Sequence, residues 1–127
     1  MEKVAVYYVS KNDDDYSNLD FIKIEEYCKQ NNYEYILYND IVNDRNITEG
    51  RNELDKLKSD ITNGIYSKIL ISTLTNVSKD VKFNLSFITY VEDNNCKIIS
   101  IDKSDPHQYK KFIDTMYKKL KEEWKYE

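Results

Sequence analysis

Residues Val4–Val9 read VAVYYV, a continuous apolar run close to the start of the chain. A run of this kind is typical of a strand that is buried on both faces, as the strands of parallel sheets are. Ser10 follows the run directly. Because sites in open parallel sheets form outside the carboxyl ends of the strands, we expect Ser10 to lie at the functional edge of the sheet.

Strand and helix patterns alternate along the rest of the chain. Further strands are expected at Tyr33–Tyr38, Lys68–Ser72 and Cys96–Ile101. Helices are expected at Leu19–Gln30, across Leu54, Leu57 and Ile61, across Val81, Leu85 and Ile88, and from Pro106 onward. Since strands that alternate with helices form βαβ units with right-handed crossovers, the sequence predicts an α/β fold. Its architecture is a four-stranded, mostly parallel sheet with flanking helices and a long C-terminal helix.

The boundaries between these elements carry further expectations. Asn39–Gly50 is predicted to be a long polar loop, and loops of that length are either functional or mobile. Gly64 is placed to end the second helix, and Ser78 is placed to cap the start of the third. No repeat or linker divides the sequence, so we expect residues 1–127 to form a single domain.

Composition limits the function. One third of the residues (33%) are charged, and the net charge of −4 is unlike that of a domain that works by neutralising phosphates. Any contact with nucleic acid therefore requires a local basic patch. The two glycines leave little room for a glycine-rich phosphate loop, and the sequence contains no G-x-G-x-x-G or Walker run.

No cofactor, metal or membrane is expected to take part. His107 is the only histidine and is predicted to be solvated, and three adjacent acids such as Asp13–Asp15 rarely converge on one ion. Cys28 and Cys96 are predicted to be reduced core residues of a cytoplasmic protein. No apolar run approaches the length of a membrane span, and no signal peptide is expected before the first strand.

Five segments, taken in order, resemble the resolvase/invertase family of serine recombinases. Val4–Lys11 resembles the family's first strand, roughly A-x-Y-x-R-V-S-T, and Glu49–Leu54 is similar to its G…R-P-x-L entry to the second helix. Ile61–Tyr66 resembles the D-I-x-x-G-x-(Y/F)-D turn, Leu70–Asp80 falls where the family has V-x-K-L-D-R-L-S-R-D, and Cys96–Asp102 resembles its last strand. The matches keep their order and spacing from residue 3 to about residue 102.

The resemblance implies a site for DNA strand exchange. In this family a serine hydroxyl attacks a DNA phosphodiester, and arginines around the phosphate stabilise the charge on its oxygens. The positions that match directly are Tyr7, Ser10, Arg51, Ser78 and Asp80, and Lys79 stands where the family has an arginine. The implied catalytic residues are Ser10, Arg51, Lys79, Tyr7 and Asp80, with Ser10 as the nucleophile.

The sequence departs from the family in its arginines. Arg45 and Arg51 are the only two in the chain. The first-strand arginine is missing, with Tyr8 nearest to its position, and the family's D-R-L-S-R has become TNVSK at residues 75–79. Losing one preorganised stabiliser costs about two to three orders of magnitude in rate. Asp13–Asp15 also place like charge beside an incoming phosphate. We therefore expect a catalytically degenerate member.

The last helix is the expected interaction element. An apolar stripe of Phe112, Ile113, Met116, Leu120 and Trp124 lies along it, and lysines cover the other faces, at positions 110, 111, 118, 119, 121 and 125. The stripe packs either on its own sheet or on a second copy, and the resemblance implies that residues 106–125 are the family's dimer helix. Expected partners are a second copy or an active recombinase, with weak DNA contact through the lysines.

Other interpretations stay open at this stage. Arg51 is equally well explained by a surface salt bridge to Glu53 or Asp55. A divergent but active recombinase that uses Ser10 with Arg51, Lys79 and lysines of a partner subunit is a second functional hypothesis. A third is a flavodoxin-like interaction module with no link to DNA.

Overall fold

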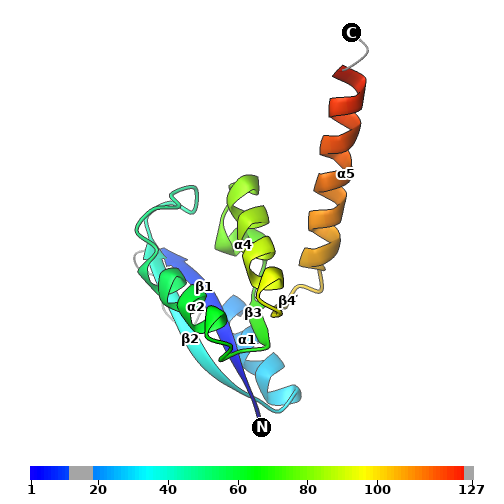
Figure 1. The fold of residues 1–127 in the computed structure, drawn as a ribbon. Helices are drawn as coiled ribbons and strands as arrows, with labels where there is room; N and C mark the ends of the chain where they lie inside the picture. Colours follow the sequence, from blue (N-terminus) through cyan, green and yellow to red (C-terminus); the bar gives the residue numbers. More distant parts are fainter. Residues whose placement is uncertain (12–18, 125–127) are drawn as a thin grey trace.

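The computed structural model describes residues 1–11 and 19–124. Its four strands are β1 (Glu2–Lys11), β2 (Tyr33–Val42), β3 (Lys68–Ile71) and β4 (Lys97–Ser100). They form one sheet in the order β2-β1-β3-β4, and every neighbouring pair is parallel (Figure 1). The helices are α1 (Leu19–Gln30), α2 (Asn52–Thr62), α3 (Leu74–Val77), α4 (Val81–Asp93) and α5 (Pro106–Trp124). The predicted α/β fold is confirmed.

The first strand is the centre of the core, as its apolar run predicts. All of Val4–Val9 is buried, and none of these side chains is more than 1% exposed. Because side chains alternate along a strand, the odd and even positions serve different faces. Tyr7 and Val9 pack with α2, α3 and α4, whereas Val6 and Tyr8 pack with α1. The direction of each β1 side chain therefore decides which residues it can meet.

Two expected boundaries are wrong. The second strand continues to Val42, so residues 39–42, which were expected to begin the 39–50 loop, belong to the strand. Ser78 does not cap α4; it ends the short α3, and Asp80 is the α4 N-cap, with its carboxylate accepting from the Phe83 backbone N–H at 3.2 Å. Both Ser and Asp are good caps, but Ser78 is used at the end of α3, so the cap of α4 lies two residues further on.

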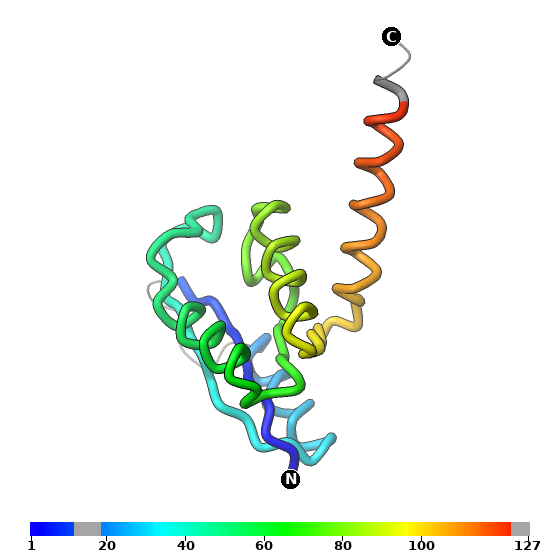
Figure 2. Tube along the Cα trace, in the orientation of Figure 1, coloured from blue at the N-terminus to red at the C-terminus, as the bar shows by residue number. Residues whose placement is uncertain are grey.

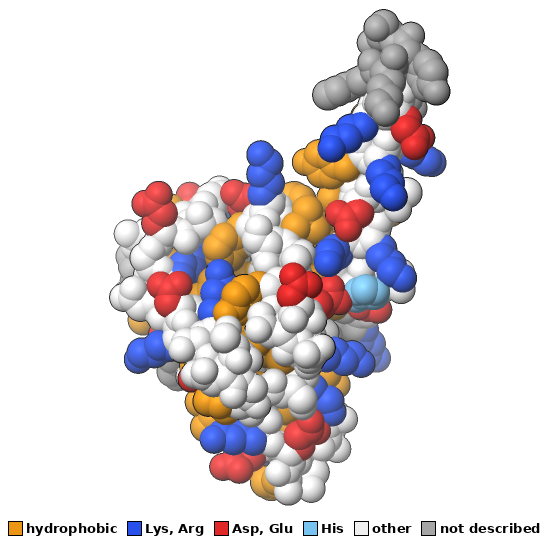
Figure 3. Space-filling model, viewed as in Figure 1, with side chains coloured by type: hydrophobic (Ala, Val, Ile, Leu, Met, Phe, Trp, Pro, Cys, Tyr) orange, Lys and Arg blue, Asp and Glu red, His pale blue; other side chains and the backbone are white. Residues whose placement is uncertain are grey.

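The last helix leaves the body of the domain. Helix α5 begins at Pro106, as expected, and projects away from α4 and the sheet (Figures 1 and 2). Its side chains Phe112, Met116, Tyr117 and Leu120 are 43% to 63% exposed. Figure 3 shows basic side chains around this projecting helix and apolar ones on part of its surface. The apolar stripe therefore does not pack on the sheet of its own chain.

Candidate active site

Ser10 lies inside β1, paired in register with Ile41 of β2. It is 2% exposed, and its Oγ accepts a hydrogen bond from Asn39 Nδ2 at 3.0 Å. The same amide group donates to the Tyr8 carbonyl at 2.8 Å. Because Ser10 is an even position of the strand, its hydroxyl lies on the α1 face of the sheet. Ser10 is thus at the expected edge but is covered and bound to a neutral amide.

Tyr7 lies on the opposite face and is joined to a carboxylate that the sequence patterns did not single out. Its hydroxyl donates to Asp40 Oδ2 at 2.8 Å. Asp40 is 5% exposed and also accepts from the backbone N–H groups of Glu53 and Leu54, at 2.9 and 3.0 Å. Asp40 therefore caps the first turn of α2 from a distance, where a negative charge is favourable. The one signal for it is an acid at the end of a strand.

Arg51 is a buried residue, so the alternative interpretation of a surface salt bridge to Glu53 or Asp55 does not hold. The side chain is 2% exposed and enters the space between α2 and the end of α3. Its guanidinium donates to the carbonyl oxygens of Val77 at 2.5 Å, Ile47 at 3.0 and 3.2 Å and Arg45 at 3.3 Å. It also donates to the Tyr7 hydroxyl at 3.4 Å. The N–H groups of the guanidinium therefore connect the 45–47 segment to the end of α3 by hydrogen bonds.

Asn76 occupies the position at which the family's D-R-L-S-R motif has its first arginine. It is 7% exposed, and its amide binds the backbone of Val9 twice: Oδ1 accepts from the N–H at 3.1 Å and Nδ2 donates to the carbonyl at 3.0 Å. The register between β1 and β3 covers only Ala5 and Val6. Asn76 therefore takes the place of a neighbouring strand beside the end of β1.

Removal of the Asn76 amide is expected to destabilise the domain. In Asn76→Ala, the buried N–H of Val9 loses its side-chain acceptor, which typically costs about 1 to 3 kcal/mol, whereas the Val9 carbonyl keeps the hydrogen bond from Arg45 Nη2. We expect a clear fall in the urea midpoint of unfolding. The control is Asn31→Ala, because Asn31 makes one exposed side-chain bond, to the Tyr27 carbonyl. Equal midpoints for the two variants would contradict this role for Asn76.

The other expected site residues lie apart from Ser10. Ser78 donates its hydroxyl to the Arg45 carbonyl at 2.9 Å and accepts from the Asp80 N–H at 3.0 Å. Lys79 and Asp80 are exposed, between α3 and α4. The structure thus brings Tyr7 and Arg51 together on one face and leaves Ser10 on the other. Asp13–Asp15, expected to repel a phosphate, lie outside the described residues.

Buried tyrosine and cysteine side chains of this core are expected to make the domain less stable at high pH. Burial raises the pKa of Tyr7 far above its usual value, an effect that the Arg51 guanidinium opposes and the Asp40 carboxylate adds to. Burial also raises the pKa of the Cys28 and Cys96 thiols from 9.0 to about 11. These groups stay protonated in the folded state while the unfolded chain loses their protons.

The sign of the pH effect follows from linkage. A raised folded-state pKa contributes stability that is complete below the unfolded value and is lost as the pH rises toward the folded value. We therefore expect the free energy of unfolding, measured in urea, to be level near pH 8 and to fall between pH 9 and 11. A free energy that stays constant across that range would contradict the burial of these groups.

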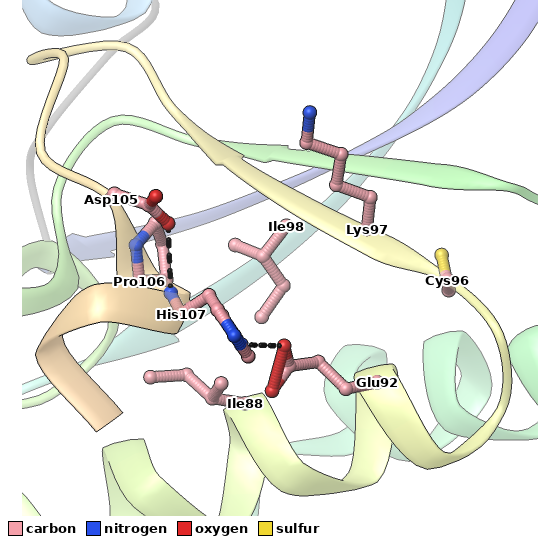
Figure 4. Close-up of a pocket in the computed structure, with 8 residues that line it drawn as sticks. All are labelled: Ile88, Glu92, Cys96, Lys97, Ile98, Asp105, Pro106 and His107. Carbon is pink, nitrogen blue, oxygen red and sulfur yellow. Dashed lines mark hydrogen bonds and ion pairs between the residues drawn. The ribbon is translucent and has the colours of Figure 1, made fainter. Parts of the chain in front are cut away.

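A cavity lies at the root of α5, and Ser10 is not among its lining residues. It has a volume of about 410 Å³ and is lined by Ile88, Glu92, Cys96, Lys97, Ile98, Asp105, Pro106 and His107. Figure 4 shows Glu92 and His107 pointing toward one another, with Nδ1 of the imidazole 2.6 Å from a carboxylate oxygen. His107 is half exposed, and Lys110 lies 3.6 Å from the same carboxylate group. These contacts tie α5 to α4.

Two kinds of feature are absent from the described part of the chain. Across residues 1–11 and 19–124, no three His, Cys, Asp or Glu side chains gather in a way that could hold a metal ion. Over the same residues, no helix has both the length and the apolar character needed to cross a membrane.

Comparisons with known proteins identify the family. The family model "Resolvase, N terminal domain" matches residues 4–125. The N-terminal catalytic domain of TP901-1 integrase is similar in structure, with a TM-score of 0.78, 18% identity and coverage of 95% of this chain and 98% of that one. A resolvase family site-specific recombinase from Streptococcus pneumoniae has a TM-score of 0.69 and 16% identity, with 98% and 91% of the two chains covered.

A third solved structure has the same fold. The C-terminal catalytic domain of ISC1926 TnpA, an IS607-like serine recombinase, has a TM-score of 0.65 and 15% identity over 89% of this chain and 79% of that one. No curated protein sequence matches the chain. The similarity in structure is of fold, whereas the family match spans nearly the whole sequence. The chain therefore belongs to the resolvase N-terminal domain family, and it is a serine-recombinase-like DNA recombination domain.

Proposed function

We propose that this chain is a catalytically degenerate serine recombinase domain that acts through dimerisation in DNA recombination or its regulation. Resolvase-family domains typically act as oligomers and bind DNA. In this proposal residues 1–127 act as one domain, and residues 106–125 are the dimer helix. The partner is a second copy or an active recombinase, and the two buried thiols suit the reducing cytoplasm.

One observation is the main support for the proposed loss of catalysis. The Ser10 hydroxyl and the Arg51 guanidinium lie on opposite faces of β1, and the donors of Arg51 are used by carbonyl oxygens. Stabilisation of a phosphoryl transition state requires donors aimed at the phosphate oxygens. Tyr7, Ser10, Arg51, Lys79 and Asp80 are then retained positions of the family's site, held by the scaffold without working together.

Dimerisation is supported by the exposed stripe of α5. Phe112, Met116 and Leu120 recur every four residues on a helix that projects from the domain, and each is at least 43% exposed. A sustained apolar stripe on a projecting helix is the pattern by which two helices pack together. Apolar side chains in such a row lose contact with water only when a partner covers them.

A plasmid assay tests the proposal. We expect the purified wild-type protein to leave supercoiled plasmid intact, neither nicked nor relaxed nor resolved, over hours at low salt. Ser10→Ala is the matched control, because it removes only the hydroxyl. Nicking or relaxation by the wild-type protein that disappears in Ser10→Ala would overturn the degenerate assignment and favour a divergent active recombinase.

A further inference from the structure

Arg45 is the arginine that reaches the backbone beside Ser10. Its Nη2 donates to the Val9 carbonyl at 3.2 Å, on the peptide unit that leads into Ser10. The side chain comes from the segment between β2 and α2, which lies at the same end of the domain as the start of α4 (Figure 2). We propose that Arg45 replaces the missing arginine of this site and binds a DNA phosphate there without supporting cleavage; this inference rests on the proposed function.

The position of the guanidinium points to such a replacement. Asn76, which stands in the place of the family's arginine, donates to the same Val9 carbonyl at 3.0 Å. Two donors that share one acceptor oxygen lie side by side. Arg45 therefore brings a positive charge close to Asn76, the position at which the family has an arginine and this chain has a neutral amide. The charge thus arrives from the loop after β2 instead of from α3.

The main chain of Arg45 is fixed by hydrogen bonds, while its side chain keeps a donor, Nε, that is unpartnered within the described residues. The Arg45 carbonyl accepts from Ser78 Oγ at 2.9 Å and from Arg51 Nη2 at 3.3 Å. Its own Nε is buried and has no hydrogen-bond partner among the described residues. A buried donor without an acceptor is costly, and an arriving phosphate oxygen relieves that cost after a small movement of the side chain.

The carboxylates near Arg45 are hydrogen-bonded to other groups. The Asp40 carboxylate is taken up by the Tyr7 hydroxyl and the α2 backbone, and the Asp44 carboxylate accepts from the Asn46 N–H at 2.9 Å. No carboxylate forms an ion pair with Arg45 within the described ranges. A planar guanidinium with parallel N–H groups matches two oxygens of a phosphodiester.

The chain offers an internal control for a direct test. Because Arg45 and Arg51 are the only arginines, a ¹⁵N-labelled protein has two arginine Nε–Hε signals, which Arg45→Lys assigns by removing one. On titration with a short DNA duplex at low salt, we expect the Arg45 signal to shift and the Arg51 signal to stay in place. A shift of Arg51 alone, or no shift of either signal, would overturn the proposal.

A salt series on variants gives a second readout. Each lost phosphate contact lowers the slope of log affinity against log salt by about 0.9. We expect this reduction for Arg45→Gln, which keeps the anchored carbonyl, and not for the matched control Lys29→Gln in the last turn of α1. Equal slopes, or no DNA binding by the wild-type protein at low salt, would refute the role of Arg45. Ser10-dependent plasmid cleavage instead refutes the proposed function, so the two failures are distinguishable.

Discussion

Arg51→Met is expected to lower the free energy of unfolding by about 3 to 5 kcal/mol, a large part of the stability of a small domain. Methionine retains an unbranched apolar chain but donates no hydrogen bond. The carbonyl oxygens of Val77 and Ile47 then lose donors in a buried place. The contact of the guanidinium with the Phe83 ring, 4.9 Å from its centroid, is lost as well.

Urea unfolding followed by circular dichroism measures this effect. The matched control is Lys56→Met, which removes one positive charge from α2, the helix that Arg51 directly precedes, at a side chain that is 71% exposed. We expect the control to stay within about 0.5 kcal/mol of the wild type, as exposed substitutions usually do. Equal losses for both variants would mean that the buried Arg51 contacts contribute no net stability, and Arg51 would then be available for a ligand.

If α5 forms the proposed dimer, Leu120→Glu is expected to weaken self-association by about a hundredfold or more. A carboxylate placed in the middle of an apolar helix interface loses its hydration without gaining a partner, at a cost of roughly 3 kcal/mol. Leu120 is 43% exposed in the single chain, so the substitution leaves the isolated domain intact. The effect therefore concerns the dimer and not the fold.

Sedimentation equilibrium over a range of concentrations measures the dissociation constant. Lys118→Gln is the matched control, because it changes the net charge by the same amount two residues earlier, on the opposite side of the helix. We expect the control to associate as the wild type does. Identical dissociation constants for Leu120→Glu and the wild-type protein would show that α5 is not the dimer interface.

The fold was predictable because its signals are local. The apolar run of Val4–Val9 places β1 at the centre of the sheet, and Pro106 marks the start of α5. The end of β2 was missed because polar residues such as Asn39 and Asp40 belong to a loop by composition. In the structure their side chains bind Ser10 and the start of α2, respectively. Long-range contacts of that kind leave no local pattern.

The sequence indicates how some of the candidate residues are separated, but it does not indicate their contacts. Alternation along β1 already separates Ser10 from Tyr7, since an odd and an even position serve different faces. Nothing local to the sequence indicates that Arg51 turns inward to bind carbonyl oxygens or that Asn76 replaces a neighbouring strand. Those arrangements depend on how the 45–47 segment packs against α3. The sequence of either segment alone does not predict that contact.

Covalent trapping on nicked DNA distinguishes a degenerate Ser10 from a working nucleophile. The purified protein is incubated with a duplex that carries a nick near the cleavage position of a recombination site, so that any attack by Ser10 leaves the protein joined to DNA through a phosphoserine. Denaturing gels and intact mass spectrometry detect the adduct. We expect no protein–DNA species for the wild type, as for Ser10→Ala. An adduct of the wild-type protein that is absent from Ser10→Ala would contradict the assignment of this chain as catalytically degenerate.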